Sequence, residues 1–281
     1  MPVRLVTDST ADLPESLVRK YGITVVPLYV HFGEEALRDG VDIWASEFYY
    51  RLENSGLLPH TSQPSPGDFL EVYHPLVEEG AEVLSIHLSR ALSGTCQSAE
   101  MAAGMIGRPV VTVVDSGLAS LGVGMVVLEA ARRIEAGAGR EEAAAAARRA
   151  SERLRVYFVV ETLEYLQKNG RIGRASGFLG SLLNVRPLLT LQDGVVTPVE
   201  KVRGKGKAVN RIFELLHERL GDKPARFAVV HGDRPDEALS LADRVKREFN
   251  CVEPPIAGYV GPVIGCHVGP GLVGVVALPD E

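Results

Sequence analysis

The amino-acid sequence predicts an α/β protein of two domains, and three observations carry that prediction. Short apolar segments of strand length alternate with amphipathic segments of helix length, which is typical of a mainly parallel sheet with helices on both faces. The 281 residues suffice for two medium domains of roughly 100 to 200 residues each. With 46% hydrophobic and 23% charged residues, the composition is that of an ordinary globular protein. We expect an N-terminal α/β/α domain with a parallel sheet at residues 1–155 and a C-terminal α/β domain at 156–281.

In the first half, short apolar runs indicate buried strands, and polar segments with periodic apolar positions indicate helices. Pro14 suits the first turn of a helix, and Ser65 followed by Pro66 is a typical helix start. The glycines of 137–139 end one helix before the next begins. The expected strands are Arg4–Val6, Ile23–Val30, Val83–His87 and Val110–Val114, and the expected helices are Pro14–Lys20, Ser46–Ser55, Phe69–Glu78, Thr95–Ile106, Ala119–Ala136 and Arg140–Leu154.

The alternation starts again after Arg155. Asp193-Gly194 between two apolar runs is a strong signal for a hairpin turn. We interpret Gly261–Leu272 as a glycine-rich loop that leads into the last strand. The expected strands are Val156–Val160, Leu188–Leu191, Val195–Val202, Arg226–His231 and Val273–Leu278, and the expected helices are Glu161–Lys168, Gly177–Leu183, Ala208–Leu220 and Asp236–Phe249.

Charge and cysteine content exclude several classes of function. The formal net charge is −6, so the chain lacks the excess of Lys and Arg expected of a nucleic-acid-binding protein. Three widely separated cysteines form no C-x-x-C pair, so neither a disulfide framework nor a metal site is indicated. The P-loop pattern is absent, and no cofactor is expected. No apolar run resembles a signal peptide or a membrane span, and we expect a cytoplasmic protein without membrane insertion.

Polar residues follow several predicted strands, where the loops of an α/β sheet converge on a ligand. Ser93-Gly94-Thr95 lies between a buried strand and a helix, and its hydroxyls and backbone N–H groups suit an anion at the positive end of the helix dipole. From this segment alone, a cap of that helix by Ser93 or Thr95 is the more common explanation. Thr61 and Ser62 are not needed to cap the helix that follows them, and His267 lies in the glycine-rich loop.

Taken together, these motifs resemble the DegV family of bacterial fatty-acid-binding proteins, which includes the FakB-type subunits of fatty acid kinase. The matching segments appear in the family's order from residue 7 to residue 271. They are Thr7–Pro14, Thr61–Pro66, Leu92–Ala99, Val114–Ser116, Leu163–Ile172 and Gly265–Gly271.

The resemblance implies a two-domain DegV-like fold that encloses one long-chain fatty acid. It places Thr61 and Ser93 on the carboxylate, with Ser62, the Gly94 N–H and His267 beside them. A buried carboxylate needs several such donors, because an unpaired buried charge is costly. The acyl chain requires an apolar tunnel, in which each buried methylene contributes roughly 0.8 kcal/mol. The expected wall residues are Met101, Met105, Phe158, Phe178, Leu179 and Leu182.

The resemblance also implies a partner, an ATP-dependent fatty acid kinase that converts the bound acid to acyl phosphate for phospholipid synthesis. In that interpretation the chain is a lipid-binding carrier without catalytic residues of its own. A local basic patch would steer such a partner, and Arg171, Arg174 and Arg203 are its expected members.

Two other functions fit the same residues. Ser93 and His267, with Asp8 or Asp115 as the acid, could form an acyl hydrolase, although a G-x-S-x-G elbow is absent. The chain could also be a lipid-responsive regulatory module that works without a kinase. The mass of a co-purified ligand and the presence of acyl-ester turnover separate these alternatives.

Overall fold

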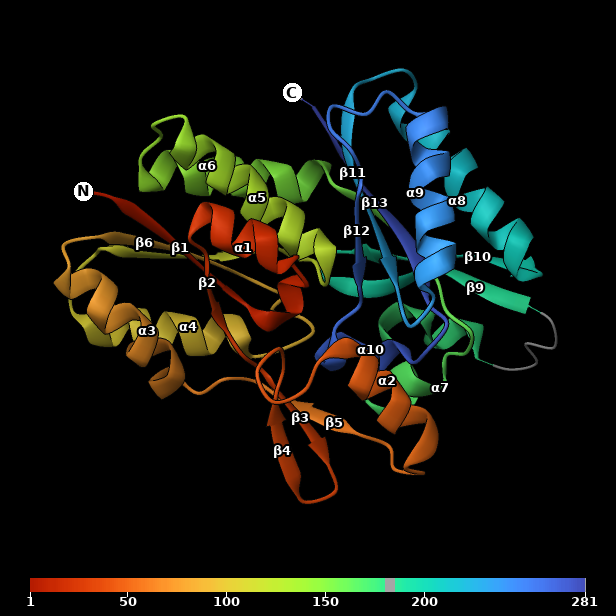
Figure 1. Cartoon of the computed structure of the whole chain (residues 1–281), viewed down its shortest axis with the longest axis horizontal. Helices are drawn as coiled ribbons and strands as arrows, with labels where there is room; N and C mark the ends of the chain where they lie inside the picture. The colour runs from red at the N-terminus through yellow and green to blue at the C-terminus, as the bar shows by residue number, and fades with distance from the viewer. Residues whose placement is uncertain (180–184, 281) are drawn as a thin grey trace.

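The computed structural model describes residues 1–179 and 185–280 and shows a mixed α/β protein with two sheet-based halves (Figure 1). In chain order the first half contains β1 (Val3–Asp8), the 3-10 helix η1 (Ser9–Ala11), α1 (Glu15–Tyr21), β2 (Thr24–Val26), β3 (Tyr29–Phe32), β4 (Glu35–Arg38), α2 (Ala45–Asn54), β5 (His60–Ser62), α3 (Pro66–Glu78), β6 (Glu82–His87), α4 (Thr95–Ile106), β7 (Val111–Asp115), α5 (Leu121–Glu135) and α6 (Arg140–Arg153). The second half contains β8 (Arg155–Val159), α7 (Glu164–Lys168), the 3-10 helix η2 (Gly173–Phe178), β9 (Val185–Gln192), β10 (Val195–Arg203), α8 (Lys205–Leu220), β11 (Ala225–His231), α9 (Pro235–Glu248), β12 (Ile256–Tyr259), α10 (Pro262–Val268) and β13 (Val273–Pro279).

The N-terminal sheet is parallel, in the order β2-β1-β6-β7, as the alternating pattern predicted. Successive side chains of a strand point to opposite faces, and both faces are covered. Val6 and Val83 pack with α3 and α4, whereas Leu5 and Leu84 pack with α5 and α6. This half is therefore a three-layer α/β/α arrangement.

The expected strand Ile23–Val30 is two strands in two different sheets. β2 ends at Val26, and β3 begins at Tyr29 in a small antiparallel sheet of order β4-β3-β5. Pro27 lies between them and has no backbone N–H to donate to a ladder. The backbone N–H of Leu28 instead donates to the Ser9 hydroxyl at 3.1 Å. The apolar run hid this break, and the small sheet carries the Thr61 region.

The C-terminal sheet has the order β10-β9-β8-β13-β11-β12, and its neighbours are antiparallel except for β11 and β12. One face packs under α8 and α9 through residues such as Tyr157, Val229 and Val275. The other face, with Phe158, Val230 and Val276, turns toward the first half. Helices of its own half therefore cover this sheet on one side.

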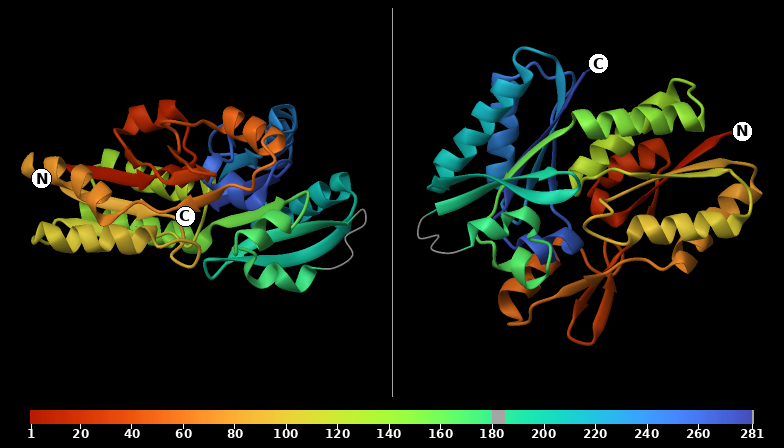
Figure 2. Two further views of the ribbon diagram at one scale, coloured as in Figure 1. Left: turned by 90° about the horizontal axis from the view of Figure 1, so that it is seen from below. Right: turned by 180° about the vertical axis from the view of Figure 1, so that it is seen from behind.

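The two halves are joined by packing rather than by a loose linker. α5 contacts β11 and β13, and α6 contacts β13. The two further views show the halves side by side with these helices reaching across (Figure 2). β8 begins at Arg155, and we propose that the domain boundary lies between residues 155 and 156.

Two local expectations in the second half need correction. The glycine-rich segment Gly261–Leu272 contains the helix α10, with Pro262 in its first turn and a bend at Gly269, where φ is +72°. The expected helix Gly177–Leu183 is replaced at its start by η2, which ends at Phe178, and the rest of that expectation lies outside the described residues. Within residues 1–179 and 185–280, no helix is both long and apolar enough to cross a membrane.

Candidate functional site

A cavity of about 420 Å³ lies between the two halves, within the size range of small-molecule sites. Its wall is mostly apolar and comes from both halves, and a few polar side chains interrupt it. The apolar residues include Leu28, Leu88, Leu92, Val156, Phe158, Leu166, Leu191, Val196, Val230, Val260, Val263, Ile264, Val268, Leu272 and Val276. The polar residues include Thr61, Ser62, Gln63, Ser93, Ser120, Arg171 and His267. The arrangement suits a molecule with a long apolar part and one polar group.

Thr61 and His267, 206 positions apart in the chain, meet at the polar part of the wall. The Thr61 hydroxyl and His267 Nε2 are 3.0 Å apart and share a hydrogen bond. The other ring nitrogen, Nδ1, is buried without a protein partner in the described part of the chain. Burial, and then the charge of Arg171, lowers the pKa of His267 to about 4. The imidazole is therefore neutral at pH 7 and offers one N–H for a hydrogen bond.

Ser93 lies at the start of α4, but Gly94 is the N-cap residue. The Ser93 hydroxyl is 2.9 Å from the Thr95 hydroxyl and accepts weakly from the Thr95 N–H at 3.4 Å. The expectation that Ser93 caps this helix is thus only partly met. Ser93 lines the cavity at the start of a twelve-residue helix, where the dipole favours an anion.

Gly94 lies directly under the amide end of the Gln63 side chain. A Cβ at this position would lie 2.3 Å from Oε1 of Gln63 and 2.5 Å from its Nε2. The Gln63 amide also donates to the Ser98 hydroxyl at 3.3 Å. Gln63 thereby connects the β5 segment to α4, and it holds Thr61 and Ser93 in the same region of the cavity.

Arg171 and Asn169 tie the α7 segment to both loops of the polar region. Arg171 Nε donates to the Leu92 carbonyl at 3.2 Å, next to Ser93. Asn169 Nδ2 donates to the Cys266 carbonyl at 2.8 Å, next to His267. The guanidinium of Arg171 lines the cavity and adds a positive charge near the hydroxyls. This cluster can hold a carboxylate through hydroxyl, imidazole and backbone donors close to one cation.

Comparison with known proteins identifies the family. A family model described as "Uncharacterised protein, DegV family" matches residues 2–280. The chain belongs to the DegV family. A DegV domain-containing protein of Streptomyces coelicolor is 42% identical over 275 residues, covering 98% of this chain and 97% of the relative. Protein DegV of Bacillus subtilis is 37% identical over 277 residues, with 98% of each chain covered.

Solved structures of DegV proteins share the fold along the whole chain. A DegV-family protein from Thermus thermophilus, described by its fatty-acid binding, is 41% identical with a TM-score of 0.94, and 100% of both chains is covered. DegV from Bacillus subtilis, described as a fatty acid binding protein, is 35% identical with a TM-score of 0.91 and full coverage of both chains. A stearic-acid-binding protein from Eubacterium ventriosum is 26% identical with a TM-score of 0.89, covering 99% of this chain and 98% of its own.

The carboxylate residues expected from the DegV resemblance all lie at one cavity or directly beside it. Thr61, Ser93 and His267 line it, and Gly94 adjoins Ser93. Ser62 also lines it, but its hydroxyl is hydrogen-bonded to His31 Nε2 at 2.8 Å. Their contact with a ligand remains a prediction, whereas their convergence is a property of the structure.

The expected tunnel wall needs correction. Phe158 lines the cavity, but Met101 and Met105 do not, because they lie on the outer face of α4 with 50% and 59% of their surface exposed. Leu179 is 40% exposed and also lies outside the cavity wall. Phe178 packs against the core beneath the Lys201 ammonium, 5.0 Å from its ring centre, and is not part of the wall. Leu182 lies outside the described residues.

Several wall residues that sequence reasoning missed come from the strands of the second sheet. Val156, Val230 and Val276 alternate with residues that face α8 and α9. Period-2 apolar alternation could have marked them as facing something other than those helices. The sequence alone could not show that a cavity, rather than a covering helix, lies on that side.

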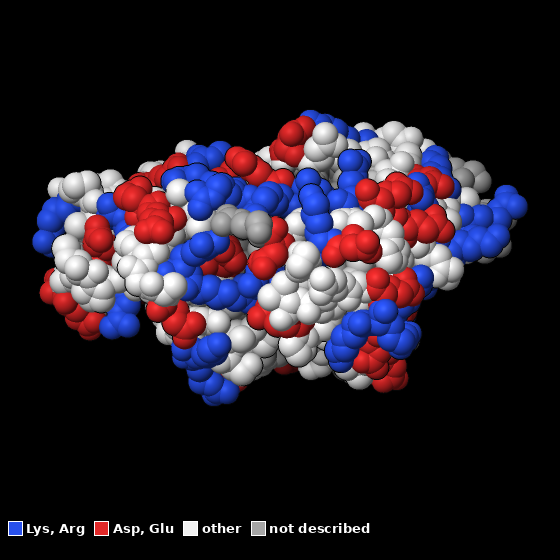
Figure 3. All heavy atoms as spheres, turned by 90° about the horizontal axis from the view of Figure 1, so that it is seen from above, with Lys and Arg blue, Asp and Glu red and all other residues white. Residues whose placement is uncertain are grey.

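The expected docking residues differ in their surroundings. Arg171 lines the cavity rather than forming only an outer surface, and Arg174 pairs with Asp193 at 2.9 Å. Arg203 is exposed at the end of β10. On the face seen in Figure 3, Lys and Arg lie interspersed with Asp and Glu, so no single-sign field covers that face.

The hydrolase alternative requires Ser93, His267 and an acid in mutual contact. The Ser93 hydroxyl is bonded to Thr95, and His267 Nε2 is bonded to Thr61, as described above. The Asp8 carboxylate is bonded elsewhere, to His87 Nδ1 at 2.8 Å. The described residues therefore do not assemble this triad.

A different serine, histidine and aspartate do form a chain. Ser85 Oγ is 2.7 Å from His87 Nε2, and His87 Nδ1 is 2.8 Å from Asp8. All three are fully buried between β1 and β6, and Ser85 also accepts a hydrogen bond from Tyr73. Asp115, the other acid considered, accepts from the backbone N–H groups of Arg90 after β6 and Gly117 after β7. The buried chain cannot meet a substrate without rearrangement, and it links the strand ends of the sheet.

Proposed function

We propose that this protein binds one long-chain fatty acid in the cavity between its halves. The observation that carries the proposal is the pairing of an apolar wall with a single polar region formed by Thr61, Ser93 and His267. The DegV relatives described as fatty-acid-binding proteins share the whole fold and support it. The acyl chain would lie against the second sheet, and the carboxylate against the hydroxyls.

The energetics of the cavity suit such a ligand. Each methylene removed from water contributes roughly 0.8 kcal/mol, so a sixteen-carbon chain contributes on the order of 10 kcal/mol before ordering costs. The polar region then has to keep the carboxylate hydrogen-bonded rather than add much affinity, because an unpaired buried charge is costly. Apolar burial would supply the affinity and the hydroxyl groups the orientation.

We further propose that the protein is a cytoplasmic carrier that presents the carboxylate to an ATP-dependent kinase for conversion to acyl phosphate. A neutral imidazole and hydroxyl donors can hold both a carboxylate and an acyl phosphate without a tight ion pair. Arg171, Arg174 and Arg203 are candidates for steering the partner, and of these Arg171 is also close enough to His267 to lower its pKa. This chain would bind and position the acid, and the partner would supply ATP and the phosphoryl transfer.

The test of binding is mass spectrometry of lipid extracted under denaturing conditions from the purified protein. We expect about one fatty acid per chain. A preparation that carries no fatty acid and takes up none when mixed with palmitate would refute the binding proposal. Steady release of acid from acyl esters, lost on Ser93→Ala, would favour a hydrolase instead.

The kinase step has its own test. Loaded protein, ATP and a bacterial extract are incubated with hydroxylamine, which traps acyl phosphate as a hydroxamate. We expect hydroxamate only when protein, ATP and extract are all present. Loaded protein that gives no hydroxamate with any fatty-acid-utilising extract would leave a regulatory lipid-binding module as the better description.

A further inference from the structure

Two carboxyl groups at the junction of the halves have no part in the site described so far. Asp12 follows η1, and Asp39 follows β4. Asp39 is only 5% exposed, and the carboxyl group of Asp12 is enclosed although its residue keeps some exposed surface. Oδ2 of Asp39 is buried without a hydrogen-bond partner in the described part of the chain. Buried acids in this state call for an explanation, because an unpaired charge in such a place is costly.

Both carboxyl groups lie against the start of α10. A Cβ on Gly261, its N-cap residue, would be 3.7 Å from Oδ1 of Asp39 and closer still to Asp12. The approach at Gly261 is close, since a Cβ there would lie 2.4 Å from Oδ1 of Asp12. The other end of this seven-residue helix carries His267. Asp12 and Asp39 of the first half therefore contact α10, the helix of the second half that carries the His267 imidazole to the cavity.

The backbone beside these contacts is strained at two residues. Asp12 and Ser120 both have left-handed backbone conformations, with φ of +51° and +53°, and the Ser120 hydroxyl donates to Asp12 Oδ2. Such conformations persist in non-glycine residues where the surroundings hold them in place. Ser120 also lines the cavity, so the same hydrogen bond connects the acid pair to the ligand space.

The groups that face the pair are acids as well. The negative charge of Asp8 from β1 adds to burial in raising the pKa of both carboxyl groups. Besides burial, the charges of Asp12 and Asp39 raise the pKa of Tyr49 from α2, and the charge of Asp39 raises that of Cys266 from α10. Burial, and then the charge of Asp39, raises the pKa of Asp12 well above its usual range. Burial raises the pKa of Asp39 to about 7. Two negative charges here would repel each other and would both lack solvation by water.

We propose that Asp12 and Asp39 are positioning residues for the fatty-acid head group, and that a proton held by the pair keeps α10, and with it His267, in place. The inference rests on the proposed function, because it assigns a regulation to the same site. While the pair keeps at least one proton, one of the two carboxyl groups is neutral and carries an O–H donor, so the two groups do not repel each other. Once the pair is fully ionised, the repulsion loosens the first turn of α10.

The direction of the pH effect follows from the raised pKa values. At these two carboxyl groups the folded state binds more protons than the unfolded state above pH 4, so their contribution to stability is lost as pH rises toward and through 7. His267 is already neutral in that range, because its pKa is about 4. Fatty-acid binding should therefore weaken between pH 6 and pH 9 for a reason that does not involve the imidazole proton.

The test measures the Kd of delipidated protein for palmitate from pH 6 to pH 9. Wild type should lose roughly tenfold in affinity, the equivalent of one pKa unit of coupling. Asp39→Asn removes one titrating carboxyl group and the repulsion between the two without changing shape, and its Kd should vary less than about twofold over the same range. Asp12→Asn is the second variant, since Asn tolerates the left-handed conformation. Asp222→Asn, at an exposed position in the turn after α8, is the matched control and should follow wild type.

A second readout follows the position of the imidazole. The NMR signals of His267 in lipid-free wild type should shift between pH 6 and pH 9 and stay fixed in Asp39→Asn. Palmitate binding with an unchanged pH slope in both Asn variants overturns this inference and leaves the proposed function standing. A complete absence of palmitate binding at every pH overturns both.

Discussion

Replacing Ser93 by Ala separates an anion site from a helix cap. Ser93 faces the cavity, whereas Gly94 is the N-cap residue of α4. Its hydroxyl contacts the Thr95 hydroxyl at 2.9 Å and accepts weakly from the Thr95 N–H. Removing it should therefore change the free energy of unfolding little, within about 0.5 kcal/mol, because the side chain is only partly buried.

The loss of ligand affinity should be larger. A hydroxyl that donates to a carboxylate contributes about 1.5–3 kcal/mol, and the neutral bond to Thr95 in the lipid-free protein offsets about 0.5–1.5 kcal/mol of that. The difference is about 1–2 kcal/mol, or roughly a 5- to 30-fold rise in Kd. Displacement of a fluorescent fatty acid from delipidated protein measures this change, and urea unfolding measures stability in the same preparation.

The matched control is Ser65→Ala. Ser65 is a true N-cap, whose hydroxyl accepts from the Asp68 N–H while the Asp68 carboxylate accepts from the Ser65 N–H. Its loss should cost about 1 kcal/mol of stability and leave Kd unchanged, because α3 lies away from the cavity wall. The reasoning is refuted if folded Ser93→Ala binds fatty acid within twofold of wild type, or if it loses stability as Ser65→Ala does.

Two further predictions concern the cavity wall and the imidazole. Val276→Phe places an aromatic ring in the cavity and should cost about 1–3 kcal/mol of stability. Relative to wild type, its loss of affinity measured by calorimetry should be at least tenfold larger for long-chain acids than for shorter ones. Equal weakening for all chain lengths would contradict the placement of the acyl chain on this sheet. The lowered pKa of His267 means that this imidazole binds more protons in the unfolded state between pH 4 and 6.5, so its own contribution to stability is lost as pH drops through that window, opposite in sign to that of Asp12 and Asp39. His267→Gln should flatten this part of the thermal-unfolding profile, and an unchanged profile would show that the imidazole is not buried as described.

The periodic apolar pattern was enough to predict a parallel first sheet, because strand and helix periods are local properties of a sequence. It could not show that Ile23–Val30 divides between two sheets, since all of its residues but Pro27 suit a strand. It also could not reveal α10 in the glycine-rich segment, where packing against α2, α7 and β3 outweighs a weak helix propensity.

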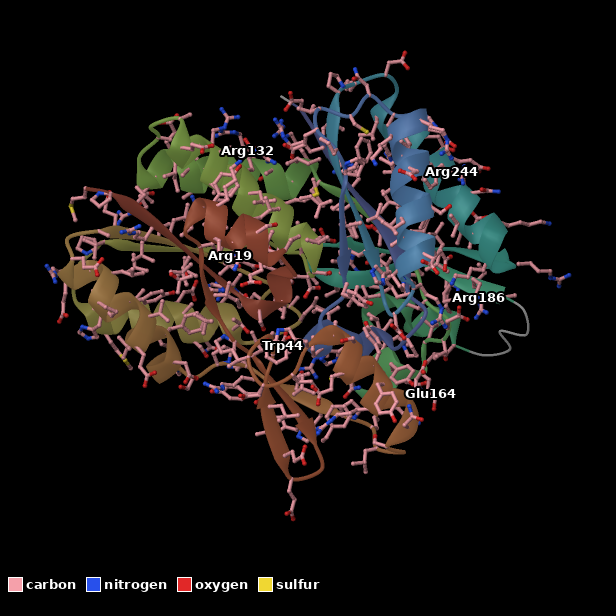
Figure 4. The ribbon with its side chains drawn as sticks, viewed as in Figure 1. Arg19, Trp44, Arg132, Glu164, Arg186 and Arg244 are labelled. Atoms are coloured by element: carbon pink, nitrogen blue, oxygen red, sulfur yellow. The ribbon has the colours of Figure 1, made fainter. Side chains whose placement is uncertain are left out.

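The burial of single apolar side chains also could not be predicted from the sequence. Trp44, labelled in Figure 4 just before α2, is 58% exposed, although tryptophan side chains are highly buried on average. Met101 and Met105 have the spacing of a buried helical stripe but lie on the outer surface of α4. Spacing identifies one face of a helix, and only the neighbouring elements decide whether that face is covered.

The sequence by itself predicted the fold class and the family, because those depend on local patterns and on the order of the motifs along the chain. Its carboxylate-binding residues stay a prediction. Tertiary structure alone decided that Thr61 and His267 touch, and that one face of the second sheet forms part of the apolar wall instead of being covered by a helix. It also placed the Asp12 and Asp39 carboxyls against α10. These contacts join residues far apart in the chain, and their geometry follows from how the two halves pack, which no local pattern encodes.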